Sequence, residues 1–360
     1  MGNDNTLEDL RRCIDQIDAQ VEDLISERVR VAQRIAELKR EAGEASYYRP
    51  DREAQVLREV IERNKGPLSD QDIARLFREI MSASLAAEAP VTVGYLGPEG
   101  TYTQSAALKH FGRSVHTQPL ATIPEVFGVV EKGQAQFGVV PVENSTEGVV
   151  THTLDMFMDS NLQICGEIHL RIRHQLIGRA ESLQSIERVL AHSQSFAQCR
   201  RWLAEHLVKA EAIPVTSNAE AAKRVTNDEN AAAIASGAAA EFYHLNVLAA
   251  DIEDDPGNTT RFLVIGNTRS GPSGQDKTSL LVSSPNKPGA LYRLLRPLAM
   301  HEVSMTRIES RPSRKGAWDY VFFIDIEGHA ADPKIAPVLN ELQQEAAFVK
   351  LLGAYPQAVL

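Results

Sequence analysis

The sequence predicts a multidomain protein with an all-α module first, a larger α/β module in the middle and a small α+β module last. Its 360 residues exceed what a single hydrophobic core usually supports. Apolar residues recur with a helical period as far as residue 90, and β-branched runs alternate with helical patterns after it. A stretch rich in glycine, serine and proline, residues 267–277, separates the last block and reads as a flexible linker.

The first helix is predicted over residues 7–39, where apolar residues alternate in steps of three and four. At 1.5 Å per residue it would be about 48 Å long, which is too long for its own module to cover. It therefore requires a second chain, so at least a homodimer is expected, and a homotetramer fits equally well. Shorter helices are predicted over residues 51–64 and 69–87, the latter capped by Ser69 and Asp72.

One position interrupts the apolar seam of the first helix. The register predicts an apolar residue at position 28, and the sequence has Arg28. A charge there is costly unless it is paired, either structurally with Glu53 or another carboxylate, or with a bound anion. Lys39 lies about 20° from Arg28 around the helix and about 16 Å along it, so both could hold one small anion. Arg11 lies about 25 Å from Arg28 and would have to come from a second chain.

The third predicted helix adds Ser84 and Glu88, one turn apart on one face. With the cations of the first helix they resemble the all-helical chorismate mutases over residues 1–90, in which the helices of two chains intertwine. The resemblance implies a chorismate site made of Arg11, Arg28, Lys39, Arg49, Arg52, Glu53, Ser84 and Glu88. It also implies that the two arginines of the long helix hold the carboxylates while Lys39 donates to the ether oxygen. This pericyclic rearrangement to prephenate needs conformational restraint and fixed charge, not a nucleophile.

Two positions depart from that family. Position 88 is Glu where many relatives have Gln, and position 49 is Arg where some relatives have an acidic residue, with an effect that the sequence leaves open. Glu88 must be protonated to donate to the ether oxygen, although an unperturbed glutamate titrates near about 4.3. Burial must therefore raise the pKa of Glu88 against the pull of Lys39.

Residues 91–268 are predicted to form an α/β module with mostly parallel strands. Polar motifs stand at the ends of its predicted strands: GPEGTYTQSAA at 97–107, VPVENSTEG at 140–148, AHSQSFAQC at 191–199 and GNTTRFLVIG at 257–266. Open α/β sheets bind their ligands at such strand ends. Each motif alone is nevertheless more often a turn or a helix cap than a binding site.

The four motifs together, in this order, resemble the prephenate dehydratases over residues 91–268. That family implies a two-lobed fold like that of periplasmic binding proteins. It also implies a prephenate site made of Thr101, Asn144, Ser145, Thr146, Gln194, Thr260 and Arg261. Prephenate loses its ring carboxylate and its hydroxyl together, so a donor is needed at the departing hydroxyl. The resemblance implies Thr260, acting as proton donor or by positioning substrate or water. Arg261 is left between binding the side-chain carboxylate and forming a structural ion pair.

The last block, residues 278–355, reads as strand, helix, strand, strand, helix, strand, which predicts a ferredoxin-like unit. The segments NKPGALYRLL at 286–295 and ESRP at 309–312 resemble ACT regulatory domains. The resemblance implies that phenylalanine is bound by Asn286, Gly289, Ala290, Leu291, Glu309 and Ser310. Gly289 and Ala290 at a helix start would leave room for a carboxylate near backbone amides, or else form an ordinary tight turn. Feedback inhibition rests on the resemblance alone, and the sequence leaves open whether other aromatic amino acids act as effectors.

The composition narrows the partners and the compartment. A net charge of −10 disfavours nucleic acid or an anionic membrane as partner. The first residues lack the pattern of a signal peptide, and no apolar run approaches the roughly 20 residues of a membrane span, so a cytoplasmic location is expected. Cys13, Cys165 and Cys199 lack metal-ligand spacing, and there is no P-loop, no H-E-x-x-H and no G-x-G-x-x-G after a strand. Neither a metal nor a cofactor is expected.

Taken together, the resemblances imply a bifunctional enzyme of phenylalanine biosynthesis that converts chorismate through prephenate to phenylpyruvate. The alternative is a non-enzymatic cytosolic amino-acid sensor, because two-lobed α/β domains also serve as small-ligand binding proteins. A second alternative keeps the helical fold purely as a dimerisation arm, which would leave Arg28 as an unexplained cost. Arg28, Lys39 and Thr260 favour the enzyme.

Overall fold

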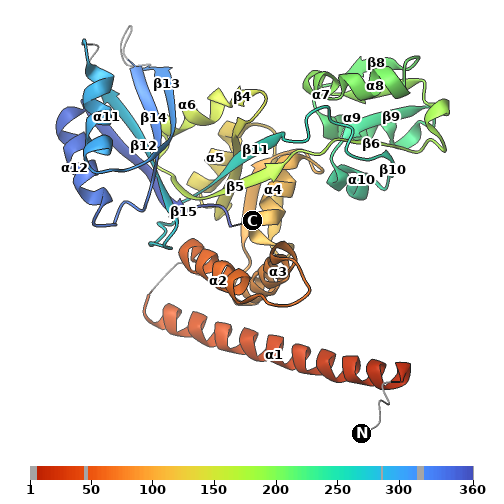
Figure 1. The fold of residues 1–360 in the computed structure, drawn as a ribbon, viewed down its shortest axis with the longest axis horizontal. Coiled ribbons are helices and arrows are strands. Elements are labelled where there is room, and N and C mark those ends of the chain that lie inside the picture. Colours follow the sequence, from red (N-terminus) through yellow and green to blue (C-terminus); the bar gives the residue numbers. More distant parts are fainter. Residues whose placement is uncertain (1–5, 44–47, 285–286, 314–319, 360) are drawn as a thin grey trace.

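The computed structural model describes residues 6–43, 48–284, 287–313 and 320–359. Figure 1 shows the three predicted modules: helices at the N-terminal end, a two-lobed α/β body and a smaller α+β unit beside it. The helical module consists of α1 (Leu7–Glu41), α2 (Pro50–Arg63) and α3 (Asp70–Glu88). Thr6 caps the N-terminus of α1 in a capping box with Asp9. At the start of α3, the Ser69 hydroxyl accepts the Asp72 N–H, as predicted.

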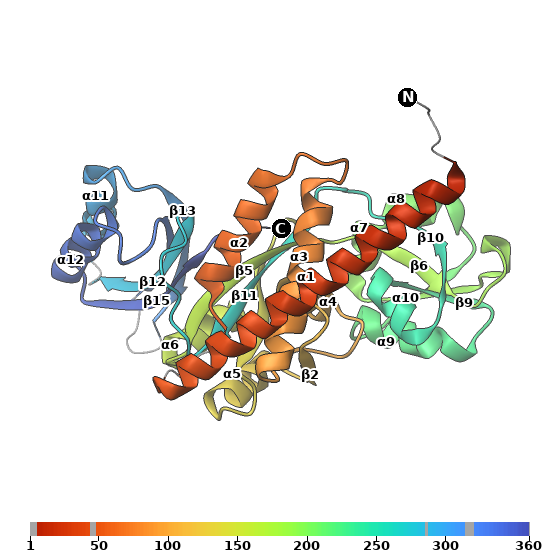
Figure 2. The ribbon, with the colours of Figure 1, turned by 90° about the horizontal axis from the view of Figure 1, so that it is seen from below.

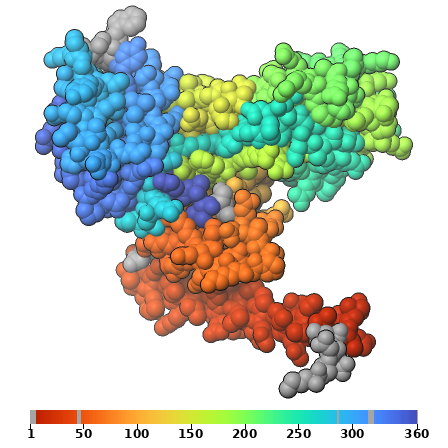
Figure 3. Space-filling model, viewed as in Figure 1, coloured from red at the N-terminus to blue at the C-terminus, as the bar shows by residue number. Residues whose placement is uncertain are grey.

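Helix α1 contacts the rest of the described chain mainly through α3. It packs on α3 and crosses the underside of the molecule in Figure 2, and it projects below the body in Figure 3. Its apolar seam faces solvent, with exposures between 46 % for Leu10 and 66 % for Leu7. The seam consists of Leu7, Leu10, Ile14, Ile17, Val21, Leu24, Val31, Ile35 and Leu38. An amphipathic helix that exposes this much apolar surface in one chain is typical of an element that another surface covers.

Lobe 1 of the α/β body is built on a sheet whose described strands run in the order β2-β1-β3-β11-β5, with β4 beside β3. Its strands are β1 (Thr92–Leu96), β2 (His116–Leu120), β3 (Phe137–Asn144), β4 (Gly148–Val149), β5 (Gln163–Arg171) and β11 (Thr259–Gly266). Its helices are α4 (Tyr102–Phe111), α5 (Ile123–Glu131) and α6 (Thr151–Asp159). Apolar side chains from these helices and strands form the two cores of the lobe.

Lobe 2 is built on a second sheet with the order β10-β6-β9-β7-β8. Its strands are β6 (Gln175–Gly178), β7 (Arg188–Ala191), β8 (Glu211–Pro214), β9 (Ala231–Ala235) and β10 (Asn246–Ala249). Its helices are α7 (Ser193–Gln198), α8 (Arg200–His206), α9 (Asn218–Arg224) and α10 (Gly237–Tyr243), with 3-10 turns at Leu183–Ser185 and Val225–Asn227. The chain leaves lobe 1 through β5 and returns through β11 (Figure 1).

The prediction of mostly parallel strands is wrong for this body. Strands β1 and β7 pair in parallel with their neighbours, but β11 is antiparallel to both β3 and β5, and β6 is antiparallel to β9 and β10. The antiparallel pairs arise where the chain crosses between the lobes, because the outgoing and returning strands lie side by side. Alternation of strand and helix patterns in the sequence does not reveal such a crossing.

The C-terminal module contains β12 (Asp276–Ser284), α11 (Ala290–Met300), β13 (Met305–Pro312), β14 (Tyr320–Glu327), α12 (Ile335–Glu345) and β15 (Phe348–Pro356). This order and the sheet order β13-β14-β12-β15 match the predicted ferredoxin-like unit. One face of the sheet packs on α11 and α12. The other face packs on lobe 1, so that Leu281, Phe323 and Leu352 belong to the core of that lobe.

The segment that precedes the C-terminal module is held in place, contrary to the expectation of a flexible linker. Arg58 of α2 donates to the Ser273 hydroxyl at 2.9 Å and to the Gln275 carbonyl at 2.9 Å. Strand β15 crosses close to β5, where a Cβ at Gly353 would collide with the backbone of Ile164. The C-terminal module is therefore fixed against both the helical module and lobe 1.

Candidate active sites

Arg28 and Ser84 join α1 to α3. The Arg28 guanidinium donates to the Ser84 hydroxyl at 2.8 Å, and that hydroxyl donates to the Ile80 carbonyl at 2.7 Å. Ser84 is buried, and its hydroxyl acts both as an acceptor and as a donor within the protein. This arrangement fixes the direction in which Arg28 points.

Glu88 lies close to the two cations of α1. Burial raises the pKa of Glu88 above its ordinary value, against the opposing effects of Lys39 and Arg28. The direction expected from the sequence is thus confirmed. Arg28, Lys39, Ser84 and Glu88 therefore gather between α1 and α3, with two cations and one carboxyl group that burial biases toward its neutral form.

The other predicted chorismate residues do not join this cluster in a single chain. Arg11 lies exposed near the N-terminal end of α1. Arg49 forms an ion pair with Asp51 at 2.8 Å. Arg52 is 62 % exposed and lies 3.8 Å from Glu59 on the same helix.

Glu53 turns away from α1. It forms an ion pair with Arg78 of α3 at 2.9 Å, and Arg78 also donates to the carbonyl of His110 in lobe 1. Burial raises the pKa of Glu53, while Arg78 and Tyr48 lower it. The structural partner of Glu53 is thus Arg78 and not Arg28, and the pair lies where the helical module meets lobe 1.

A second site lies between the two lobes of the α/β body, in a cavity of about 440 Å³. Of the residues predicted to bind prephenate, Thr101, Asn144, Gln194 and Thr260 line it. Thr101 caps α4, Asn144 ends β3, Thr260 lies in β11 and Gln194 lies in α7. The cavity thus receives polar side chains from both lobes, as expected for a site at the ends of strands.

A hydrogen bond of 2.8 Å joins Asn144 to Thr260 across neighbouring strands. The Asn144 amide nitrogen donates to the Thr260 hydroxyl and to the Asn258 side-chain oxygen, each at 2.8 Å. The Asn144 side-chain oxygen accepts the backbone N–H groups of Thr146 and Glu147, each at 3.0 Å. The amide orientation is thereby determined, and the Thr260 oxygen is an acceptor toward Asn144. The hydroxyl proton of Thr260 meets no acceptor among the described residues and is available to a ligand in the cavity.

Gln194 is engaged with a residue that the sequence did not single out. Its amide donates to Glu147 at 3.2 Å, and Gln198 donates to the other oxygen of the same carboxylate at 3.2 Å. Glu147 follows β3 in lobe 1, whereas both glutamines lie in α7 of lobe 2. This carboxylate, which also lines the cavity, therefore links the two lobes.

His174, Gln198 and Asn258 also line the cavity and were missed. His174 Nε2 lies 2.7 Å from the Gln198 side-chain oxygen, which also accepts from Asn258 at 3.1 Å. Burial lowers the pKa of His174, although Gln198 and Glu253 raise it. Asn258 belongs to the motif at 257–266 and could have been included. Single polar residues such as His174 at the end of a strand carry no sequence pattern.

Ser145, Thr146 and Arg261 do not line the cavity. The Ser145 hydroxyl accepts the Thr259 N–H at 3.0 Å and ties β3 to β11. Arg261 forms ion pairs with Glu167 at 2.9 Å and with Asp325 at 2.6 Å. Neighbouring residues of a strand face opposite sides, so Arg261 points away from the cavity that Thr260 faces. Two roles were left open for Arg261, and the structure shows it in a structural ion pair and not in the cavity.

The predicted regulatory residues lie at two places in the C-terminal module. Gly289 has φ 75° and precedes α11, where the Ala290 N–H donates to the Lys287 carbonyl at 3.0 Å. Leu291 in the first turn of α11 is 39 % exposed. Glu309 and Ser310 lie in β13, at the edge of the sheet. Asn286 lies outside the described residues.

Within the described parts of the chain, no group of three or more histidine, cysteine, aspartate or glutamate side chains could hold a metal ion. None of the helices in those parts is long and apolar enough to cross a membrane.

Comparison with known proteins agrees with this division of the chain. The family models that match are chorismate mutase type II over residues 10–89, prephenate dehydratase over 93–270 and ACT domain over 278–344. A bifunctional chorismate mutase/prephenate dehydratase from Stutzerimonas stutzeri is 54 % identical, with 100 % of both chains covered.

Two of the solved structures that resemble the chain each cover about three quarters of it. Prephenate dehydratase from Arthrobacter aurescens in complex with L-Phe is 36 % identical with a TM-score of 0.69, over 74 % of this chain and 90 % of that one. A protein described as GqqA, a novel type of quorum quenching acylase, is 30 % identical with a TM-score of 0.70, over 74 % of this chain and 98 % of that one.

The likeness in fold extends to proteins with different described activities, so the fold alone does not decide the function. The match to the Stutzerimonas stutzeri enzyme, which extends over both whole chains, does decide the function. This match disfavours the amino-acid sensor. The chain belongs to the family of bifunctional chorismate mutases/prephenate dehydratases.

Proposed function

We propose that the two reactions of this bifunctional enzyme take place at the two sites described above. Residues 1–90 rearrange chorismate to prephenate, residues 91–268 convert prephenate to phenylpyruvate, and residues 278–355 bind phenylalanine. The observation that supports the second assignment most strongly is the Asn144–Thr260 hydrogen bond at 2.8 Å, which leaves the threonine proton directed to a ligand.

In the dehydratase reaction, the bond between the ring and its carboxylate breaks and its electron pair aromatises the ring. The 4-hydroxyl then departs with one added proton as water, and CO₂ leaves. Thr260 donates a hydrogen bond to the departing oxygen, where negative charge develops in the transition state. Asn144 holds the threonine oxygen in place, and the substrate is contacted by Thr101 from lobe 1 and by Gln194 from lobe 2. His174 lies between the Tyr102 hydroxyl and the Gln198 side chain, and burial lowers its pKa, which favours an uncharged ring beside a site that must release CO₂.

In the mutase reaction, Arg28 binds one carboxylate of chorismate, and Lys39 and protonated Glu88 donate to the ether oxygen as its bond breaks. The Arg28–Ser84 hydrogen bond supports a fixed cation, and the raised pKa of Glu88 supports a neutral donor. Arg11 of a second copy supplies the other carboxylate contact. Arg49, Arg52 and Glu53 begin α2 with other partners, so each would have to exchange its partner before contacting chorismate.

We propose that the enzyme is at least a dimer. The exposed apolar seam of α1 supports a second copy as its cover, since isolated apolar surface of this kind is unfavourable in water. A cytoplasmic location is part of the proposal, and the free thiols of Cys13, Cys165 and Cys199 are compatible with it.

Phenylalanine is proposed as the effector. The left-handed Gly289 at the start of α11 supports a carboxylate site beside backbone N–H groups, and Glu309 and Ser310 lie in the neighbouring edge strand. The Arthrobacter aurescens structure described with L-Phe supports the choice of ligand.

The test is to supply the purified full-length enzyme with chorismate and to follow chorismate, prephenate and phenylpyruvate separately, with and without phenylalanine. We expect phenylpyruvate to form and phenylalanine to suppress it. Prephenate that accumulates without phenylpyruvate would contradict the dehydratase assignment. Phenylpyruvate formation that phenylalanine leaves unchanged would contradict the effector assignment.

A further inference from the structure

The residues behind the Asn144–Thr260 pair are held by the C-terminal module. In the sheet of lobe 1, Thr260 lies opposite Asn144, and the next pair in the register is Arg261 opposite Glu143. Because side chains alternate between the faces of a sheet, Arg261 and Glu143 share the face away from the cavity. Each is bound by a residue of the C-terminal module.

Arg261 is bound by Asp325 of β14. The two side chains are 2.6 Å apart and 11 % and 7 % exposed. Asp325 in turn accepts from the Ser279 hydroxyl at 2.5 Å, and Arg261 also donates to the Tyr355 hydroxyl at 3.1 Å. The catalytic strand is thus tied to three strands of the C-terminal sheet.

Glu143 is bound by Arg307 of β13, with a distance of 3.0 Å between their charged atoms. Arg307 is 11 % exposed and Glu143 is 39 % exposed, so this ion pair is shielded from water on the arginine side only. In the C-terminal sheet, Arg307 lies directly opposite Asp325. Two register partners of the lobe 1 sheet therefore bind two register partners of the C-terminal sheet. We call these four residues the inter-sheet clamp: Glu143, Arg261, Arg307 and Asp325.

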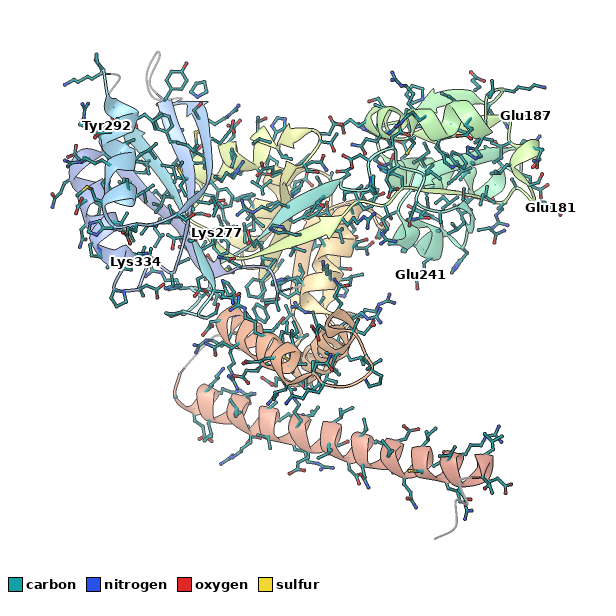
Figure 4. The ribbon with its side chains drawn as sticks, viewed as in Figure 1. Glu181, Glu187, Glu241, Lys277, Tyr292 and Lys334 are labelled. Atoms are coloured by element: carbon teal, nitrogen blue, oxygen red, sulfur yellow. The ribbon has the colours of Figure 1, made fainter. Side chains whose placement is uncertain are left out.

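The base of the clamp, at Arg261, is held by further ion pairs, whereas the arginines on β13 have hydrogen-bond donors without acceptors. Lys277, labelled in Figure 4 where β12 meets the central sheet, donates to both oxygens of Glu167, which also binds Arg261. On β13, one terminal nitrogen of Arg307 and Nε of Arg311 are buried with no hydrogen-bond partner among the described residues. Buried donors without acceptors are costly, so the β13 side of the clamp is less stabilised than its base.

Strand β13 also carries two of the residues proposed to bind the effector. Glu309 lies two positions from Arg307 on the same face, and Ser310 follows it. A displacement of β13 by a ligand would therefore move Arg307, and through Glu143 it would move the end of β3 that carries Asn144.

We propose that Arg307 is a positioning residue for the dehydratase reaction, through which the C-terminal module sets the geometry of the Asn144–Thr260 pair by way of the inter-sheet clamp. The regulatory half of this inference rests on the proposed binding of phenylalanine. The positioning half does not, because it is argued only from contacts between residues of the chain.

The test compares Arg307→Gln with Arg311→Gln in the full-length enzyme. Arg311 is the matched control, because it lies on the same face of β13 and pairs with Asp155 of lobe 1 at 2.9 Å, but Asp155 lies in α6 and not beside the catalytic pair. For Arg307→Gln we expect the dehydratase kcat to fall about three- to tenfold with KM changed less than about twofold. Arg311→Gln should change kcat less than about twofold, and mutase activity should be unchanged in both.

The double variant Glu143→Gln with Arg307→Gln tests whether the two residues act through one ion pair: its kcat should be no lower than that of the more impaired single variant, whereas losses that multiply would contradict a shared pathway. Calorimetry with phenylalanine separates binding from coupling: Arg307→Gln should bind phenylalanine like the unaltered enzyme and be inhibited less by it. Equal losses of kcat in Arg307→Gln and Arg311→Gln, or full inhibition of Arg307→Gln at unchanged kcat, would overturn the proposal. If the unaltered enzyme binds no phenylalanine, the effector assignment fails, and the kcat comparison still decides whether Arg307 positions the catalytic pair.

Discussion

Asn144 and Thr260 face each other across the antiparallel strands β3 and β11, and their side chains are joined by a hydrogen bond of 2.8 Å. The asparagine amide is itself fixed by two backbone N–H groups. The Thr260 hydroxyl is therefore oriented by an asparagine side chain whose own position is fixed by the backbone that follows β3. This is a more rigid support than an unrestrained side chain would give.

Replacing Thr260 by alanine should abolish dehydratase activity and leave mutase activity intact. Loss of a donor to the departing hydroxyl should lower kcat by about 10²- to 10⁴-fold. Thr260→Ser should retain a measurable part of the activity, because it keeps the hydroxyl. The matched control is Thr259→Ala, since the Thr259 hydroxyl donates to the Gly257 carbonyl at 3.2 Å and does not line the cavity. Separate assays of prephenate and chorismate consumption check this, and loss of both activities in Thr260→Ala would point to misfolding.

Mutase activity should fall as the pH rises through the pKa of Glu88. The group must be protonated to donate, and burial raises its pKa above the ordinary value of about 4.3. Glu88→Gln places a permanent donor there and should flatten the profile on that side. The measurement is kcat/KM for chorismate as a function of pH in both forms, and a profile unchanged by the substitution would contradict the role of Glu88.

Ile17→Lys should convert the enzyme to a monomer. Ile17 lies in the apolar seam of α1 with 51 % exposure, and a charge there cannot be buried against a second copy without a large desolvation cost. Mutase activity should fall about a hundredfold or more, since a monomer lacks the second Arg11. Dehydratase activity without phenylalanine should persist. Light scattering gives the mass, and Asp15→Lys on the polar side of the same helix is the control that should leave the mass unchanged.

Glu167→Gln should destabilise the junction between lobe 1 and the C-terminal module at neutral pH. Burial alone would raise the pKa of Glu167, but His169, Arg261 and Lys277 hold it well below its ordinary value. Because the pKa is lowered on folding, this carboxylate stabilises the protein above its unfolded pKa of about 4.3 and loses that effect as the pH falls further. The substitution should cost about 3 to 5 kcal/mol at pH 7, because two buried cations lose a partner.

The difference between Glu167→Gln and the unaltered enzyme should therefore shrink in acid, which urea unfolding at pH 7 and at pH 3.5 would measure. The control is Asp228→Asn, which breaks the half-exposed ion pair with Arg188 and should change the free energy of unfolding by less than about 1 kcal/mol. A difference for Glu167→Gln that grew in acid would contradict the assignment.

The sequence predicted the elements whose signal is periodic and the site residues that belong to compact motifs. The helix α1 and its interruption at Arg28 follow from apolar spacing, and Thr260 and Asn144 follow from their motifs. The orientation of Arg261 could also have been predicted, because it must face away from whatever Thr260 faces. Glu147 and Asn258 belong to quoted motifs and could have been included, whereas His174 could not, since what makes it part of the site is the approach of two lobes separated in sequence. For the same reason nothing predicted that Glu53 would pair with Arg78, because spacing along a helix does not say which neighbour each face will meet.

In the described part of the C-terminal module, α11 and α12 cover one face of the sheet and lobe 1 packs on the other, while the edge strand β13 stays largely exposed. Detaching the module would expose Leu281, Phe323 and Leu352 to water, which is strongly unfavourable. A signal that passes through this junction must therefore be carried by a small shear between surfaces that stay in contact, since such surfaces slide more easily than they separate. The C-terminal module is therefore part of the hydrophobic core of the catalytic lobe, and we expect it to stay in contact with that lobe throughout regulation.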